Sequence, residues 1–127
     1  MANYTYMSPD ELVELLDKPD SFTKVAVVDC RDSDRHCGII VNSISVPTIS
    51  STAEVYEGLA KTLFEEGKEV VAFHCAQSLI RGPKGANRFA LAQQKLGYPL
   101  PAVHVLRGGW EAFYNMYGDA RPDLMYV

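Results

Sequence analysis

Short apolar runs rich in β-branched residues recur along the chain and predict its strands. Residues 24–29 form such a run, and residues 69–73 form a second. Runs of this length without strict polar alternation are typical of strands buried on both faces of a parallel sheet. Residues 102–106 predict a further strand, and so do residues 43–46, where Pro47 stops the run.

Helical patterns occupy the stretches between these runs. Ser8 can cap a helix that starts at Pro9, and Glu11 lies where a capping box requires an acidic residue. Later helices are predicted over residues 52–66, 84–96 and 110–117. Strands that alternate with helices of about ten to fifteen residues imply βαβ units with right-handed crossovers. The predicted fold is therefore an open α/β sandwich around a parallel sheet.

Composition narrows this picture to one ordinary globular domain. The chain has 127 residues, of which 47% are hydrophobic, and no repeat or linker divides it. We therefore expect a single domain over residues 1–127. The net charge is −4 with both signs mixed along the chain, which argues against partners such as nucleic acid or anionic lipid. The sequence shows neither a signal-peptide pattern nor a bilayer-length apolar run, so we expect a cytoplasmic protein without membrane contact.

The cysteines exclude two classes of small domain. There are three, Cys30, Cys37 and Cys75, with no CxxC pair and no Cys/His ligand spacing. An odd number without such spacing argues against a disulfide scaffold and against a zinc site. We expect no metal and no bound cofactor, and the sequence gives Cys37 no role.

The strongest chemical pattern is the segment from His74 to Arg81. It lies between a predicted buried strand and the helix that follows, where α/β sheets bind their ligands. A loop of this length can curl so that its backbone N–H groups surround a tetrahedral oxyanion, and the helix dipole adds partial positive charge. The predicted oxyanion-binding loop consists of Ala76, Gln77, Ser78, Leu79, Ile80 and Arg81.

Cys75 and Arg81 are the candidate catalytic residues of this loop. A helix N-terminus and a nearby guanidinium favour the thiolate, which is the nucleophilic form of cysteine. The planar fork of Arg81 can bind two oxygens of an anion and stabilise charge in the transition state. A single cysteine after a strand is more often an inert packed thiol, and a single arginine is usually solvated. The combination of strand, cysteine, five residues, arginine and helix favours catalysis.

Three segments together resemble a known family. HCAQSLIRGPKGANRFALAQ, VVDCRDSD and VLRGGWEAFY are similar to the rhodanese fold in its phosphatase-like branch, which includes the M-phase inducer tyrosine phosphatases. The resemblance is closer still to the arsenate/antimonate reductases of protozoan parasites. It implies a five-stranded parallel sheet with helices on both faces. It also implies an anion of phosphate or arsenate size, because the sulfurtransferases of the family have a shorter loop, with four residues after the cysteine.

The resemblance implies a function and leaves alternatives open. The leading hypothesis is reduction of arsenate or antimonate, with glutathione as co-substrate and glutaredoxin as partner. The alternative is a phosphatase that acts on phosphotyrosine or aryl phosphates. The cell-cycle phosphatases carry loop carboxylates where this chain has Ala76 and Ile80, and no other general acid is evident. A sulfurtransferase and a non-catalytic module are the remaining alternatives.

Further residues have weaker assignments. Cys30 matches the family's second cysteine, which can form a disulfide with the nucleophile, so it is a candidate redox partner of Cys75 or else a packed core thiol. Lys84 and Arg88 follow the loop and could attract an anionic substrate or glutathione. The alternative for both is a solvated helix face.

Overall fold

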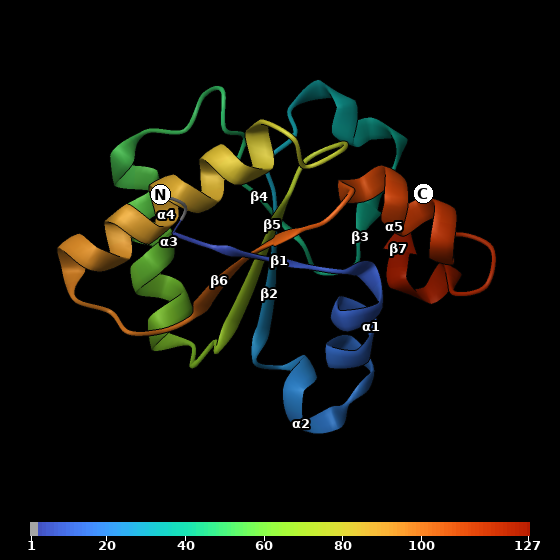
Figure 1. Cartoon of the computed structure of the whole chain (residues 1–127), viewed down its shortest axis with the longest axis horizontal. Helices are drawn as coiled ribbons and strands as arrows, with labels where there is room; N and C mark the ends of the chain where they lie inside the picture. Colours follow the sequence, from blue (N-terminus) through green and yellow to red (C-terminus); the bar gives the residue numbers. More distant parts are fainter. Residues whose placement is uncertain (1–2) are drawn as a thin grey trace.

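The computed structural model describes residues 3–127 and shows a central sheet with helices on both sides (Figure 1). The parallel strands are β1 (Thr5–Met7), β2 (Val25–Asp29), β4 (Ile44–Ser45), β5 (Val70–His74) and β6 (Ala102–Leu106). Their order in the sheet is β1-β6-β5-β2-β4, so β5 is the middle strand. The predicted α/β fold with a five-stranded parallel sheet is confirmed.

Two hydrophobic cores lie on opposite faces of the sheet. The helices are α1 (Pro9–Asp17), α2 (Pro19–Phe22), α3 (Ala53–Glu65), α4 (Arg81–Leu96) and α5 (Gly109–Tyr117). Val28 and Phe73 point to the face covered by α3 and α4, whereas Val27 and Ala72 point to the face covered by α1 and α5. This alternation along buried strands explains why β2 shows no polar face in the sequence.

Small elements complete the molecule beside α5. A 3₁₀ helix, η1 (Ser33–Cys37), follows β2, and a second one, η2 (Pro122–Leu124), precedes the C-terminus. The antiparallel pair β3 (Ile39–Ile40) and β7 (Met125–Tyr126) ties the C-terminal segment to the chain after η1. No helix within residues 3–127 is long and apolar enough to cross a membrane.

The first helix, α1, begins where the sequence predicts, whereas α4, the helix after β5, begins earlier than predicted. The Ser8 hydroxyl accepts from the Glu11 N–H at 3.1 Å and the Glu11 carboxylate accepts from the Ser8 N–H at 3.0 Å, which confirms the capping box. The helix predicted from Lys84 begins instead at Arg81. The sequence pattern predicts a start after the Gly82-Pro83 pair, because both residues interrupt a helical pattern. Pro83 lies in the first turn of α4, however, where the missing N–H would have no helical partner in any case.

Candidate active site

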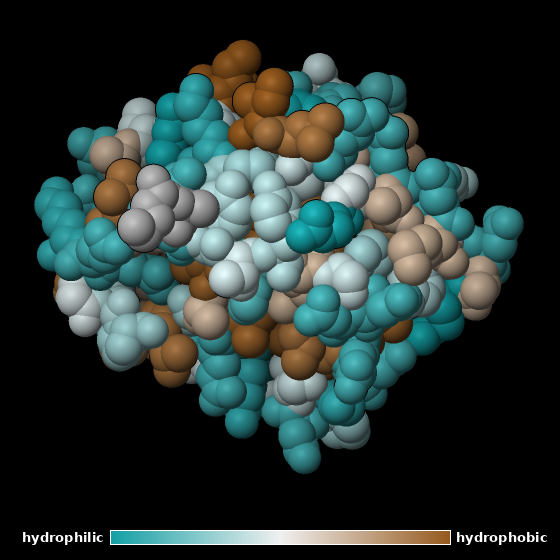
Figure 2. All heavy atoms as spheres, in the orientation of Figure 1, coloured by the Kyte–Doolittle hydropathy of each residue, from teal (hydrophilic) through white to brown (hydrophobic). Residues whose placement is uncertain are grey.

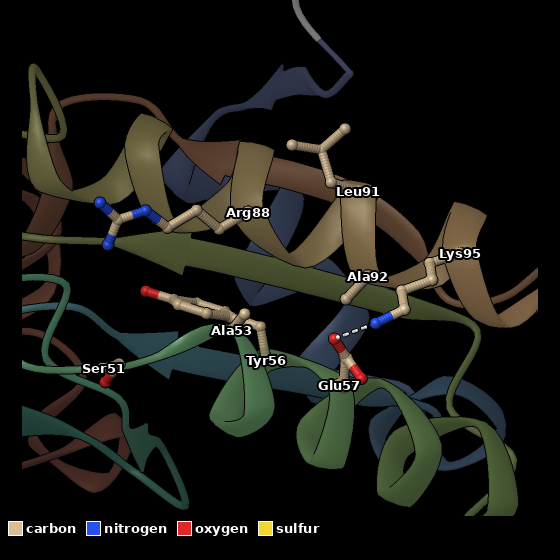
Figure 3. A pocket seen from close by; sticks show the side chains of 8 residues that line it. All are labelled: Ser51, Ala53, Tyr56, Glu57, Arg88, Leu91, Ala92 and Lys95. Carbon is tan, nitrogen blue, oxygen red and sulfur yellow. Dashed lines mark hydrogen bonds and ion pairs between the residues drawn. The ribbon is translucent and has the colours of Figure 1, made fainter.

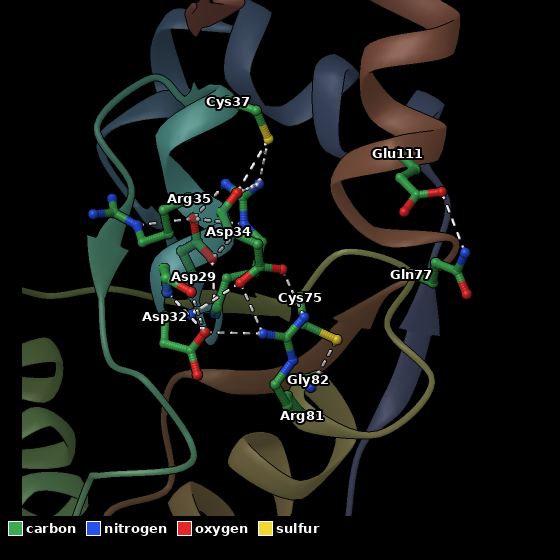
Figure 4. A network of polar contacts seen from close by, with 12 residues as sticks. Asp29, Asp32, Asp34, Arg35, Cys37, Cys75, Gln77, Arg81, Gly82 and Glu111 are labelled. Carbon is green, nitrogen blue, oxygen red and sulfur yellow. Dashed lines mark hydrogen bonds and ion pairs between the residues drawn. The ribbon is translucent and has the colours of Figure 1, made fainter.

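The loop after β5 places Cys75 at the carboxyl end of the middle strand. Cys75 is buried, and α4 starts six residues later at Arg81. Gly82, in the first turn of α4, donates its N–H to Cys75 Sγ at 3.3 Å (Figure 4). A backbone donor aimed at the sulfur stabilises negative charge that develops there. The structure thus brings together the strand end, the cysteine and the helix N-terminus that the sequence pattern indicates.

The loop curls because one of its residues adopts a left-handed backbone conformation. Ser78 has φ of 57°, which reverses the direction of the chain between Gln77 and Leu79. Its hydroxyl is buried and accepts the N–H of Cys75 at 3.5 Å. Ser78 therefore supports the loop from inside, while its neighbours face the open side.

A cavity of about 360 Å³ opens over the loop. Its lining residues are Cys75, Ala76, Gln77, Leu79, Ile80, Arg81 and Glu111. All predicted loop residues except Ser78 line it. Leu79 and Ile80 are 73% and 74% exposed, and hydrophobic side chains gather at the upper end of the molecule where the loop lies (Figures 1 and 2).

The guanidinium of Arg81 is held by a carboxylate that the sequence pattern did not reveal. Its two terminal nitrogens donate to the two oxygens of Asp34 at 2.9 and 2.8 Å, and Asp32 lies 3.7 Å from one of them (Figure 4). The contact with Arg81 lowers the pKa of Asp34 to about 2, and the same contact raises the pKa of Arg81. The fork predicted for an oxyanion is thus occupied by Asp34, 47 residues away in sequence.

Beneath η1 lies a buried ion pair that fixes the segment carrying Asp34. Arg31 is almost fully buried and donates to Asp29 at 2.8 Å and to the Gly38 carbonyl at 2.7 Å. Arg31 also lies 5.1 Å from the centre of the Trp110 ring, a cation–π distance. Burial alone would raise the pKa of Asp29, but hydrogen bonds from Arg31 lower it below its usual range. Both charges are paired, as buried charges must be.

His74, the residue before the nucleophile, is fully buried. Its Nδ1 lies 3.1 Å from the carbonyl oxygen of Cys75. Its Nε2 is buried and has no hydrogen-bond partner among the described residues. Burial lowers the pKa of His74, so the ring is neutral at pH 7. The ring therefore orients the loop backbone.

The N-terminus of α5 holds the loop from the other side. Trp110 and Glu111 donate their N–H groups to the carbonyls of Cys75 and Ala76, each at 3.0 Å. This close approach requires Gly109, because a Cβ there would lie 2.7 Å from the Ala76 oxygen. The side chain of Glu111 accepts from Gln77 at 3.2 Å (Figure 4). Glu111 is the one carboxylate in the described lining of the cavity, and only its position after the GlyGlyTrp turn could have suggested it.

Cys30 lies beside Cys75 at the end of the neighbouring strand. Asp29 pairs with His74 in the sheet, and the Cys30 N–H donates to the His74 carbonyl at 2.7 Å. Both cysteines belong to the hydrophobic core under α3 and α4. Burial raises the pKa of the Cys30 thiol to about 12. A redox role for Cys30 stays a prediction, since all three thiols are free.

Cys37 is exposed and lies apart from this pair. Its Sγ is 3.1 Å from the Asp34 carbonyl oxygen in η1. Across residues 3–127 no group of three or more His, Cys, Asp or Glu side chains is arranged to hold a metal ion.

A parallel α/β sheet with a cysteine loop at the end of its middle strand defines a class of protein. The sequence model described as Rhodanese-like domain matches residues 8–116, and the chain belongs to this family. This confirms the resemblance inferred from the three sequence segments.

The chain is similar to individual proteins of two kinds, reductases and a phosphatase. A solved structure of the As-Sb reductase from Leishmania major is 78% identical, with a TM-score of 0.97 over 98% of this chain and 86% of that one. The dual specificity phosphatase ibp1 of Schizosaccharomyces pombe is 29% identical over 99% of both chains. Arsenate reductase 2.2 of Oryza sativa is 34% identical over 67% of this chain and 61% of its own length.

Proposed function

We propose that this protein reduces arsenate and antimonate through Cys75. The observation that carries the proposal is the 78% identity and TM-score of 0.97 to a protein described as an As-Sb reductase. The loop geometry supports it, because Cys75 accepts a backbone N–H and Arg81 lies at the rim of the same cavity. Glutathione is the proposed co-substrate and glutaredoxin the proposed partner.

In the first step the Cys75 thiolate attacks the arsenic of H₂AsO₄⁻. An S–As bond forms and one As–OH bond breaks. The departing hydroxyl takes a proton from solvent and leaves as water, and no electrons are transferred, so the adduct still contains As(V). Arg81 and the loop N–H groups stabilise the charge on the remaining oxygens, which requires Arg81 to exchange Asp34 for the substrate.

Reduction occurs when a second thiol attacks the sulfur of Cys75. An S–S bond forms, the S–As bond breaks, and its electron pair stays on arsenic, which becomes As(III). The proton of the attacking thiol goes to an arsenite oxygen. A further thiol then attacks the mixed disulfide, which restores Cys75 and releases the oxidised co-substrate as a disulfide. Two thiols lose two electrons in total, and arsenic gains two.

The test is an assay of arsenate reduction with glutathione and glutaredoxin. We expect Cys75→Ser to abolish turnover while anion binding is retained, because a hydroxyl keeps the shape but not the nucleophilicity. Arg81→Ala is expected to lower kcat/KM for arsenate by about 10²–10³, the usual cost of losing a strong oxyanion donor. Full activity in either variant would refute the mechanism.

A phosphatase activity on aryl phosphates is the second candidate. The match to a dual specificity phosphatase over 99% of both chains favours it, and phosphate shares the charge and shape of arsenate. Because Ala76 and Ile80 supply no carboxylate in the loop, we expect aryl phosphates to be hydrolysed far faster than alkyl phosphates. Equal rates for phosphotyrosine and phosphoserine would reveal a general acid, and Glu111→Gln would then test the one carboxylate at the cavity.

A further inference from the structure

The proposed reduction needs a second thiol at Cys75, and the chain itself supplies none suited to the task. Cys30 is fully buried, and burial raises its pKa to about 12, so it stays protonated at neutral pH and reacts too slowly to serve in every turnover, although it can still trap an oxidised Cys75 over longer times. Cys37 is exposed but is not among the residues that line the loop cavity. The attacking thiol therefore comes from a separate molecule, which requires a binding place next to the loop.

Three cavities with shared walls lead away from Cys75. The loop cavity shares Ile80 and Arg81 with a second cavity of about 390 Å³. The second cavity shares Ser51 and Arg88 with a third one, of about 530 Å³, which lies between α3 and α4. The three cavities therefore adjoin one another along α4, and each has a volume in the range of small-molecule sites. We call this row of adjoining cavities the groove.

The α3–α4 end of the groove carries one buried polar group, the Tyr56 hydroxyl, without a partner in the part of the chain that the structure describes. Tyr56 is 1% exposed, lines the third cavity, and has a hydroxyl with no hydrogen-bond partner among residues 3–127. Buried hydroxyls are rarely left unsatisfied, so this one indicates a ligand or ordered water. In Figure 3 the Tyr56 hydroxyl and the Arg88 guanidinium point toward the same end of the groove.

Arg88 supplies positive charge at the junction of the second and third cavities. One terminal nitrogen donates to the Thr48 carbonyl at 3.0 Å, which fixes the side chain, and the planar fork has further N–H donors. Lys84, one turn nearer the loop, lines the second cavity. At the far end Lys95 is paired with Glu57 at 3.0 Å (Figure 3). The positive charges of Lys84 and Arg88, which have no carboxylate partner in the described residues, therefore lie between the loop and the middle of the groove.

We propose that this groove binds the thiol co-substrate as an anionic peptide, with a carboxylate on Arg88 and the thiol directed at Cys75. The inference rests on the proposed reductase function, since it concerns the reductant of that reaction. Arg88 lies seven residues beyond Arg81 on α4, a rise of about 10 Å. An extended tripeptide spans roughly 10 Å from end to end. The thiol of glutathione is on the central residue, so the span from thiol to carboxylate is somewhat shorter, and the long side chain of Arg88 covers the remainder.

Binding of S-methylglutathione, whose blocked thiol prevents reaction, tests this site by calorimetry on the full chain. Arg88→Gln is expected to weaken binding at least tenfold, and Tyr56→Phe by roughly twofold to fivefold, since a carboxylate contact outweighs one neutral hydrogen bond. The exposed Lys61→Gln on α3, outside the groove, is the matched control and should bind like the parent. The dimethyl ester of the ligand should bind more weakly than the free acid.

In steady-state assays Arg88→Gln should raise KM for glutathione while KM for arsenate stays unchanged. Tyr56→Phe removes only one oxygen and keeps the core packed. It therefore remains a usable test if Arg88→Gln destabilises the loop that contains Thr48, whose carbonyl accepts from Arg88. Absence of S-methylglutathione binding to the parent, or equal binding by the parent and both groove variants, would overturn the proposal. Groove-dependent binding by a protein that reduces no arsenate would instead leave the site standing and refute the proposed function.

Discussion

At the scale of single residues, the guanidinium of Arg81 is already paired with the carboxylate of Asp34 before a substrate binds. The two oxygens of Asp34 lie where an oxyanion would present two of its own, at 2.9 and 2.8 Å from the guanidinium nitrogens. The pair is only partly buried, with side chains 30% and 39% exposed, so its net stabilisation is about 0.2–1 kcal/mol. A substrate can therefore displace Asp34 at modest cost.

Asp34→Asn is expected to lower KM for arsenate about twofold to fivefold, because the amide competes less well for Arg81. The measurement is initial rate against arsenate concentration at saturating reductant. Asp119→Asn, another exposed acidic residue, is the control for the change in net charge. An increased KM would show instead that Asp34 positions Arg81 for the substrate.

The second residue-scale prediction concerns Cys30. The low exposure and raised pKa of Cys30 make it a poor target for peroxide, whereas the Gly82 N–H stabilises negative charge on the Cys75 sulfur, so we expect peroxide to oxidise Cys75 before Cys30. Neighbouring parallel strands lie about 4.8 Å apart, so Cys30 is close enough to trap sulfenic acid at Cys75 as a disulfide. We expect mass spectrometry after mild peroxide to show a reversible Cys30–Cys75 bond.

Cys30→Ser should keep normal initial rates but lose recoverable activity faster under peroxide. Pairing of Cys75 with Cys37, or equal sensitivity of Cys30→Ser and the parent, would leave Cys30 as a packing residue.

At the scale of elements, the active-site loop is set by the way two helices approach it. The start of α4 supplies the Gly82 N–H to the sulfur, and the start of α5 supplies two N–H groups to loop carbonyls. Gly85 brings α4 close as well, since a Cβ there would lie 2.8 Å from the Cys30 sulfur. The loop conformation thus depends on glycines outside the loop.

Gly109→Ala should destabilise the fold by about 2–5 kcal/mol, from backbone strain at φ of 64° together with the clash against the Ala76 carbonyl. Activity should fall as well, because the loop must move. Gly67→Ala is the matched control: its φ is 76°, but no atom lies within 4 Å of the added Cβ, so only the strain of about 1 kcal/mol remains. Urea denaturation measures the free energy of unfolding of both variants, and an equal decrease in the two would argue against a clash at Gly109.

Elements were predictable from the sequence where the pattern is local. The strands β2 and β5 stand out as unbroken apolar runs, and the capping box at Ser8 lies within four residues. The strand β1 has three residues of which only Met7 is buried, so no apolar run marks it. The contact between Asp34 and Arg81 and the contact between Gln77 and Glu111 arise from folding and have no local signature.

At the scale of the whole molecule, a neutral histidine in the core couples stability to pH. Burial lowers the pKa of His74 and of His104, so the folded protein binds fewer protons than the unfolded chain just below pH 6.5. The free energy of unfolding that depends on these two histidines is therefore at its maximum above about pH 6.5. It falls as the pH decreases from there, because the unfolded chain binds the protons first.

We expect the free energy of unfolding to drop between pH 7 and pH 5, by up to about 1.4 kcal/mol per pH unit for His74. Urea denaturation at several pH values measures the slope, and His74→Gln should reduce it. The carboxylates with lowered pKa values, Asp29 among them, act only at lower pH. A flat profile from pH 7 to pH 5 would contradict the prediction.

The central place of β5 has a consequence for how such a protein can change its chemistry. The nucleophile sits on a strand flanked by β2 and β6, and the segments that follow these two neighbours, residues 30–38 and 107–111, both reach the loop. The reactive sulfur and Arg81 are anchored by β5 and α4, while the two carboxylates that contact the loop, Asp34 and Glu111, come from flanking segments that carry no strand of the main sheet. Substrate preference can thus diverge through exchanges in these two flanking segments, with the thiol and its helix left untouched.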